Sequence, residues 1–244
     1  MAKLTLGRRI ASVFFPERCV CCDKVIPPGE GTCAACGAEL PRIGSPVCPF
    51  CGMEKNRCTC HRRRHPYERA VAPFYYEGNL AAAVLRFKQS GDAGAAAWFG
   101  EQMADTVARY YDDISFDGVT FVPSFPKKER ERGFNPGRLM AEAAAKALGL
   151  PLLPLLVKIT DTPPQKSLSA PERSGNVLGV FDLAEGAEVA GKNLLLADDT
   201  LTTGATLNEC AKMLKIYGAE AVYVVAAAIT AADRDREQKK RESR

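Results

Sequence analysis

The sequence has no stretch that is long and apolar enough to cross a membrane. Its longest apolar run, Ala221–Ile229, is far shorter than the roughly 18 residues that a bilayer-spanning helix needs, and it suits a buried strand better. The apolar patch at residues 10–15 is also shorter than the core of a secretion signal, about 7–15 residues, and no small-residue cleavage site follows it. These absences predict a soluble, cytoplasmic protein with no membrane span.

The sequence also lacks a large excess of charge of either sign. Its 46% apolar and 25% charged residues are ordinary for a globular protein, and they exclude a wholly disordered chain, a collagen-like chain and a coiled-coil rod. The net charge of +4 is unevenly distributed. Residues 1–70 hold 12 Lys and Arg against 6 Asp and Glu, whereas the rest hold 21 against 23. The positive excess hints at an anionic partner for the first third of the chain.

Four segments follow one another along the chain. Residues 1–18 have apolar side chains near helical spacing, which predicts an amphipathic lead-in helix. Residues 19–66 are rich in Cys, Gly, Pro and Arg and bury too little apolar surface to fold without another source of stability. Residues 67–232 alternate apolar runs with helical patterns. Residues 233–244 are predicted to be a disordered, charged tail.

The cysteines are concentrated in one segment: nine of the ten lie between Cys19 and Cys60, and Cys210 is alone. Where no export signal precedes them, CxxC pairs indicate a metal site rather than disulfides. Four thiolates bind structural zinc in a closed tetrahedral site that leaves no position open for catalysis. Sequence order predicts two such sites, formed by Cys19, Cys22, Cys33 and Cys36 and by Cys48, Cys51, Cys58 and Cys60.

Some features of the cysteine segment have more than one interpretation. Cys21 is an alternative ligand for the first site and His61 for the second. Gly37 and Gly52 each follow the second cysteine of a pair, where a positive φ would aim backbone N–H groups at the sulfurs. The basic cluster at the end of the segment is either a solvated linker or a contact with a nucleic-acid backbone; it consists of Arg57, His61, Arg62, Arg63, Arg64 and His65.

The pattern of residues 67–232 is typical of an α/β protein. Strands alternating with helices of about 10–15 residues favour a parallel sheet covered on both faces. The predicted strands are 70–76 (broken at Pro73), 119–122, 193–197 and 222–229, and the predicted helices are 80–88, 98–111, 139–148 and 206–217.

The stretch LLLADDTLTTGAT at 194–206 indicates a sugar-phosphate site. Its buried strand fixes the following loop at the carboxyl edge of the sheet, where open α/β folds bind ligands. No Gly-Lys-Ser/Thr follows, which excludes a Walker-type nucleotide loop. Asp198 and Asp199 would repel a bare phosphate but suit the hydroxyls of a ribose. Hydroxyls and backbone N–H groups at the next helix start form the predicted phosphate cradle: Thr202, Thr203, Gly204, Ala205 and Thr206.

This stretch resembles the signature of type I phosphoribosyltransferases, which bind phosphoribosyl pyrophosphate. Three further segments are similar to the ComF (competence protein F) family of that superfamily: YYEGNLAAAVLRFKQSGD at 75–92, VPSFPKKERERGFNPGRLMA at 122–141 and TPPQKSLSAPERSGNVLGVF at 162–181. In that family a cysteine module precedes the phosphoribosyltransferase domain. The resemblance implies a phosphoribosyltransferase-like parallel sheet flanked by helices, with a small zinc module before it.

The resemblance also implies residue roles. Asp198 and Asp199 would be the catalytic pair that holds the ribose hydroxyls, and residues 202–206 would bind the 5′-phosphate. The loop at residues 88–91, with Lys88 and Gly91, would face the pyrophosphate and its Mg²⁺.

Residues 124–137 resemble the mobile lid of that family. Basic side chains on a loop bounded by Gly and Pro suit a flexible clamp on pyrophosphate, although a solvated charge run is the competing interpretation. Arg173 and Asn176 are further family-typical polar positions. The basic residues of the lid are Lys127, Lys128, Arg130 and Arg132.

Three functions are compatible with these features. The first is a magnesium-dependent phosphoribosyltransferase, which displaces pyrophosphate at the anomeric carbon of ribose. The second is handling of incoming single-stranded DNA during natural competence, with Arg62, Arg63 and Arg64 on the strand and a DNA-uptake ATPase as a further partner. The third is a non-catalytic sensor of phosphoribosyl pyrophosphate. Structural zinc and substrate-bound magnesium are the expected metals.

Overall fold

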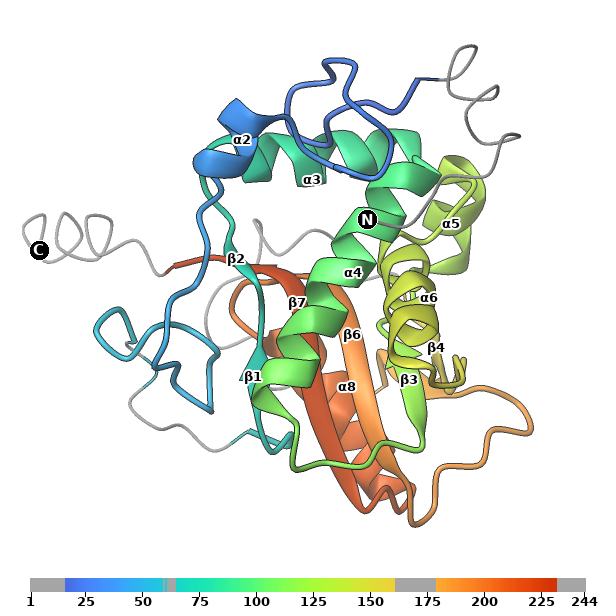
Figure 1. Cartoon of the computed structure of the whole chain (residues 1–244). Coiled ribbons are helices and arrows are strands. Elements are labelled where there is room, and N and C mark those ends of the chain that lie inside the picture. Colours follow the sequence, from blue (N-terminus) through green and yellow to red (C-terminus); the bar gives the residue numbers. More distant parts are fainter. Residues whose placement is uncertain (1–15, 59, 61–64, 161–178, 232–244) are drawn as a thin grey trace, which may run out of the picture.

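A computed structural model describes residues 16–58, 60, 65–160 and 179–231 of the chain (Figure 1). Most of the predicted lead-in helix lies outside these residues. So do Arg62, Arg63 and Arg64, the positions Arg173 and Asn176, and the predicted tail.

A parallel sheet lies at the centre of the molecule (Figure 1). It consists of β1 (Ala70–Val71), β2 (Phe74–Tyr75), β3 (Gly118–Phe121), β6 (Asn193–Leu201) and β7 (Ala221–Ile229). The strands run in the order β1-β7-β6-β3, β2 also pairs with β7, and all pairings are parallel. The four predicted strands are thereby confirmed, with the break at Pro73 separating β1 from β2.

Helices cover both faces of the sheet, as the sequence predicts. α4 (Ala93–Tyr110) and α6 (Pro136–Leu148) pack on one face and α8 (Ala205–Ile216) on the other (Figure 1). α3 (Gly78–Ser90) belongs to the apolar cluster on the α4 side. Residues 194–197 of β6 and nearly all of β7 are apolar because each face of these strands meets a helix.

The packing of α4 on α6 leaves no room for a side chain at Gly100. A Cβ atom there would lie 2.3 Å from the Cβ of Ala143 and 2.7 Å from the backbone N of Ala144. α6 begins directly after Asn135, whose buried side-chain amide donates a hydrogen bond of 3.2 Å to the Val122 carbonyl, just beyond β3. The close helix pair therefore fixes the start of α6 at the carboxyl end of the sheet.

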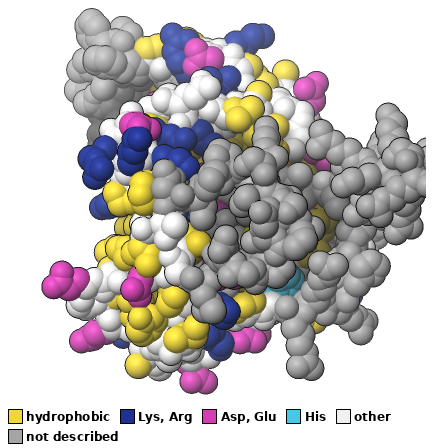
Figure 2. Space-filling view, turned by 180° about the vertical axis from the view of Figure 1, so that it is seen from behind, with side chains coloured by type: hydrophobic (Ala, Val, Ile, Leu, Met, Phe, Trp, Pro, Cys, Tyr) yellow, Lys and Arg dark blue, Asp and Glu magenta, His cyan; other side chains and the backbone are white. Residues whose placement is uncertain are grey.

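Several short elements are not predicted from the sequence: α2 (Ala34–Ala38), α5 (Pro126–Arg132) and the antiparallel pair β4 (Leu156–Lys158) and β5 (Phe181–Leu183). The expectation of a positive φ after the second cysteine of a pair is wrong for Gly37, which lies in α2 and has no positive φ. It is confirmed for Gly52, with φ 71°. α5 forms half of the segment predicted as a loop-like lid. It starts at a proline, ends at Gly133 with φ 86° and buries none of its residues. In Figure 2, Lys and Arg side chains gather at the upper left, which is the side of the molecule on which α5 lies.

The cysteine segment wraps around the edge of the sheet formed by β1 and β2. The backbone N–H of Tyr75 donates to the Pro41 carbonyl at 2.8 Å, that of Ile43 donates to Pro73 at 3.0 Å, and that of Ala70 donates to Pro49 at 2.9 Å. The segment thereby supplies hydrogen-bond partners that a further strand would otherwise provide. Its first part packs on α3 and its second part lies beside β1 and β2 (Figure 1).

Candidate functional site

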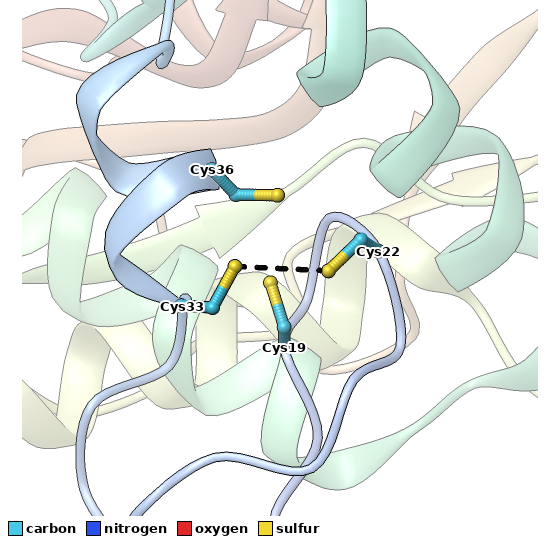
Figure 3. Close-up of side chains that lie close together, drawn as sticks. All are labelled: Cys19, Cys22, Cys33 and Cys36. Carbon is cyan, nitrogen blue, oxygen red and sulfur yellow. Dashed lines mark hydrogen bonds between the residues drawn. The ribbon is translucent and has the colours of Figure 1, made fainter.

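The first cysteine quartet has its four sulfurs pointing toward one point (Figure 3). All four lie within 4.8 Å of one another, and the sulfurs of Cys22 and Cys33 are 3.7 Å apart. A tetrahedral zinc ion with bonds of about 2.3 Å holds its sulfurs about 3.8 Å apart, so the quartet fits zinc. Burial opposes the thiolate of Cys19, but backbone N–H groups of neighbouring cysteines lower its pKa to about 6. The quartet is Cys19, Cys22, Cys33 and Cys36.

The second quartet is equally compact and consists of Cys48, Cys51, Cys58 and Cys60. Its sulfurs are 3.7 Å apart between Cys48 and Cys60, 3.5 Å between Cys51 and Cys58, and 3.3 Å between Cys58 and Cys60. These distances also fit one tetrahedral ion. Gly52 packs this quartet closely against β1, since a Cβ atom on Gly52 would lie 2.9 Å from the Ala70 carbonyl oxygen.

Cys21 and Cys210 belong to neither quartet. Cys21 is buried in the apolar cluster beside α3, and burial raises the pKa of its thiol to about 11. Cys210 is fully buried in α8, and burial raises the pKa of its thiol as well. Both are protonated, apolar core residues in this environment.

The acidic pair lies within β6 rather than after it, because the pairing of β6 with β7 continues to Leu201. Asp198 Oδ1 accepts a hydrogen bond of 2.8 Å from the backbone N–H of Asp199. Asp199 is paired with Lys88 of α3, with 2.8 Å between Oδ1 and Nζ. Burial, and next the charge of Asp199, raise the pKa of Asp198 well above its ordinary value of 3.8. A carboxyl group with so strongly raised a pKa, next to a charged pair, is typical of a functional site.

The predicted phosphate cradle connects β6 to α8. Gly204 caps the helix with φ 75° and ψ 1°, a left-handed conformation that other residues adopt at a cost. The residues on both sides of it are exposed: Thr202, Thr203, Ala205 and Thr206. Because the first N–H groups of a helix have no partner within the helix, this start presents donors to an anion.

The loop after α3 and the end of the lid segment are in contact. Gly91 ends α3 with φ 62°, and a Cβ atom there would lie 2.7 Å from the Phe134 ring. Phe134 also packs on Phe87, with ring centroids 6.4 Å apart. Arg130 and Arg132 lie in the last turn of α5, which precedes Phe134. The structure therefore brings Lys88 to the acidic pair and attaches the lid segment to the end of α3.

Two residues beside the cradle, His65 and Tyr67, are absent from the predicted site. His65 Nδ1 lies 2.9 Å from Asn208 Oδ1 in α8, and Tyr67 Oη lies 3.7 Å from where a Cβ of Gly204 would stand. A sequence signal for them is weak, since His65 and Asn208 are 143 positions apart.

None of the helices in the described parts of the chain has the length and apolar character needed to cross a membrane. Two family models match the chain: a double zinc ribbon domain over residues 10–67 and a phosphoribosyl transferase domain over residues 135–244. The second match contains the acidic pair and the cradle, and the first contains both quartets.

Curated relatives match along most of their length. Competence protein F of Haemophilus influenzae is 27% identical over 86% of this chain and 96% of its own. Competence protein ComFC of Bacillus subtilis is 28% identical over 78% of this chain and 80% of its own. DNA utilization protein YhgH of Escherichia coli is 26% identical over 86% of this chain and 95% of its own. With its two matched regions in this order, the chain is similar along most of its length to competence protein F and ComFC, with a match to a double zinc ribbon domain followed by a match to a phosphoribosyl transferase domain.

Proposed function

We propose that the protein binds phosphoribosyl pyrophosphate with Mg²⁺ at the carboxyl end of β6, and that it acts in the cytoplasm on incoming DNA. The observation that carries the proposal is the acidic pair followed directly by the glycine-capped start of α8. In this arrangement Asp198 and Asp199 accept hydrogen bonds from the ribose hydroxyls. The helix start binds the 5′-phosphate.

Lys88 makes the acidic pair compatible with an anionic ligand. Its ammonium lies 2.8 Å from Asp199 and offsets that negative charge. It also provides a cation at the position proposed for the pyrophosphate. Mg²⁺ bound through one or two carboxylates and the substrate's own oxygens would neutralise the remaining charge, and the oxygen donors of the pair suit it.

Replacing Asp198 by Asn is expected to weaken binding and stabilise the fold. The loss of a charge-assisted hydrogen bond lowers affinity for phosphoribosyl pyrophosphate about 10- to 100-fold by calorimetry. Because the folded-state pKa of Asp198 is raised, the folded chain carries a penalty that starts as the pH rises above about 4 and persists at neutral pH. Asp198→Asn removes this penalty, and at pH 7 the melting temperature rises by about 2–4 °C.

The stabilisation should shrink as the pH falls through about 4 and vanish below it, because Asp198 is then protonated in the unfolded state as well as in the folded state. Asp112→Asn, an exposed position after α4, is the matched control and leaves affinity and melting temperature unchanged. Absence of binding by the parent protein with Mg²⁺ would contradict the proposal. Release of pyrophosphate with a panel of nitrogen bases distinguishes an enzyme from a sensor.

For the DNA part of the proposal, the relatives' names (competence protein and DNA utilization protein) and the basic cluster at residues 61–65 provide the support. Substituting Arg62, Arg63 and Arg64 together by Ala is expected to weaken single-stranded DNA binding. It should also lower the slope of log affinity against log salt by about 2. The control removes the same charge from exposed Arg109, Lys146 and Lys212. Equal losses in both triple variants would exclude a strand contact at residues 62–64. Co-purification is the test for the proposed DNA-uptake ATPase.

A further inference from the structure

The rings of His65 and Tyr67, here called the ring stack, lie between the second cysteine quartet and the phosphate cradle. The two rings are parallel within 4°, with centroids 4.7 Å apart. Tyr67 is 4% exposed and belongs to the same apolar cluster as Cys48 and Cys51. Its hydroxyl lies 3.7 Å from where a Cβ atom of Gly204, the cap of α8, would stand. The ring stack therefore lies close to both structures.

His65 also determines how Asn208 is oriented. An amide oxygen can only accept hydrogen bonds, so at 2.9 Å the Nδ1 of His65 is the donor and Asn208 Oδ1 the acceptor. With its oxygen held there, Asn208 directs its amide nitrogen to the cradle, where Nδ2 lies 3.9 Å from the Cβ position of Gly204. An amide N–H₂ at this place adds a side-chain donor to the backbone donors of the helix start.

We propose that His65 is a positioning residue for Asn208, and that the ring stack couples zinc binding at the second quartet to phosphate binding at the cradle. The inference rests on the proposed binding of phosphoribosyl pyrophosphate. Folding of a cysteine quartet depends on its metal, so the ring stack is held in place only in the zinc-loaded state. Coupling between two sites is reciprocal: if zinc improves the affinity for the ligand, the ligand improves retention of that zinc by the same factor.

The positioning role is tested by titrating phosphoribosyl pyrophosphate and Mg²⁺ into the zinc-loaded full chain. His65→Ala and Asn208→Ala are each expected to weaken binding about three- to tenfold, and the double variant no further, because both remove one donor. His65→Asn keeps a donor near the Nδ1 position and should restore most of the affinity. Lys212→Ala, exposed on the same helix, is the control.

The coupling is tested by measuring zinc transfer to a chromogenic chelator. A saturating concentration of phosphoribosyl pyrophosphate and Mg²⁺ should slow the release of one of two zinc equivalents from the parent protein. The same addition should slow zinc release from His65→Ala by a smaller factor. A parent protein that binds the ligand, with His65→Ala equal to it in affinity and in zinc release, would overturn this inference alone. A parent protein that binds no ligand would overturn the proposed function, and the inference with it.

Discussion

Removal of zinc is expected to unfold the cysteine segment and to lower the melting temperature of the whole chain by more than about 10 °C. Structural zinc contributes roughly 10–16 kcal/mol of apparent binding free energy to small cysteine modules at neutral pH. The segment has few apolar side chains of its own, and those it buries, such as Val20, Ile26 and Ile43, belong to the two clusters of the sheet. Its unfolding therefore exposes α3 and the β1 edge as well. Each kcal/mol corresponds to about 2–4 °C in a chain of this size.

The measurement is circular dichroism against temperature before and after chelation, with metal analysis of both samples. The parent protein should hold two zinc ions per chain. Cys22→Ser should lose one, whereas Cys210→Ala should retain both, because Cys210 is buried apart from either quartet. An unchanged melting temperature after confirmed removal of both ions would refute a structural role for zinc.

Replacing Gly100 by Leu is expected to destabilise the chain by about 3 kcal/mol and to lower its melting temperature by about 6–12 °C. The added side chain meets backbone and Cβ atoms of α6 at distances below 3 Å, and neither can move without separating the two helices. Because the start of α6 lies beside Asp198, the same change should weaken ligand binding. A Cβ on Gly137 would stand 3.6 Å from Asp198 Oδ1, which shows how close these elements are.

Urea denaturation of the two proteins provides the measurement. Ala97→Leu, at an exposed position one turn earlier in α4, adds the same side chain without the contact and should change the unfolding free energy by less than about 0.5 kcal/mol. Equal effects of the two substitutions would show that the contact between α4 and α6 does not determine the stability.

The apolar pattern predicts the main strands and helices. A strand that is buried on both faces must be apolar along its length, and a helix packed on a sheet has apolar residues at helical spacing. The apolar pattern predicts the end of β6 four residues too early, because Asp198 and Asp199 break that pattern while the backbone pairing with β7 continues to Leu201. The sequence does not predict α5, because none of its residues is buried and no apolar periodicity indicates a helix there. The His65–Asn208 contact depends on tertiary folding over 143 positions, which a single sequence does not reveal.

The grouping of the cysteines, unlike the His65–Asn208 contact, can be predicted from the sequence. CxxC spacing is a local constraint, and the structure gathers the two quartets in sequence order. Cys21, an open alternative at the sequence level, faces the apolar cluster beside α3 instead. The basic residues at 62–64 lie outside the described residues, so their role remains a prediction.

The hydrogen bonds from the cysteine segment to β1 and β2 have a consequence for the fate of the protein when metal is scarce. A chain that loses its zinc also loses the backbone that occupies this edge of the sheet. Exposed strand edges can pair with those of other molecules, so we expect the metal-free chain to aggregate more readily than the zinc-loaded chain. Zinc supply would then influence the amount of soluble protein as well as its affinity for the ligand.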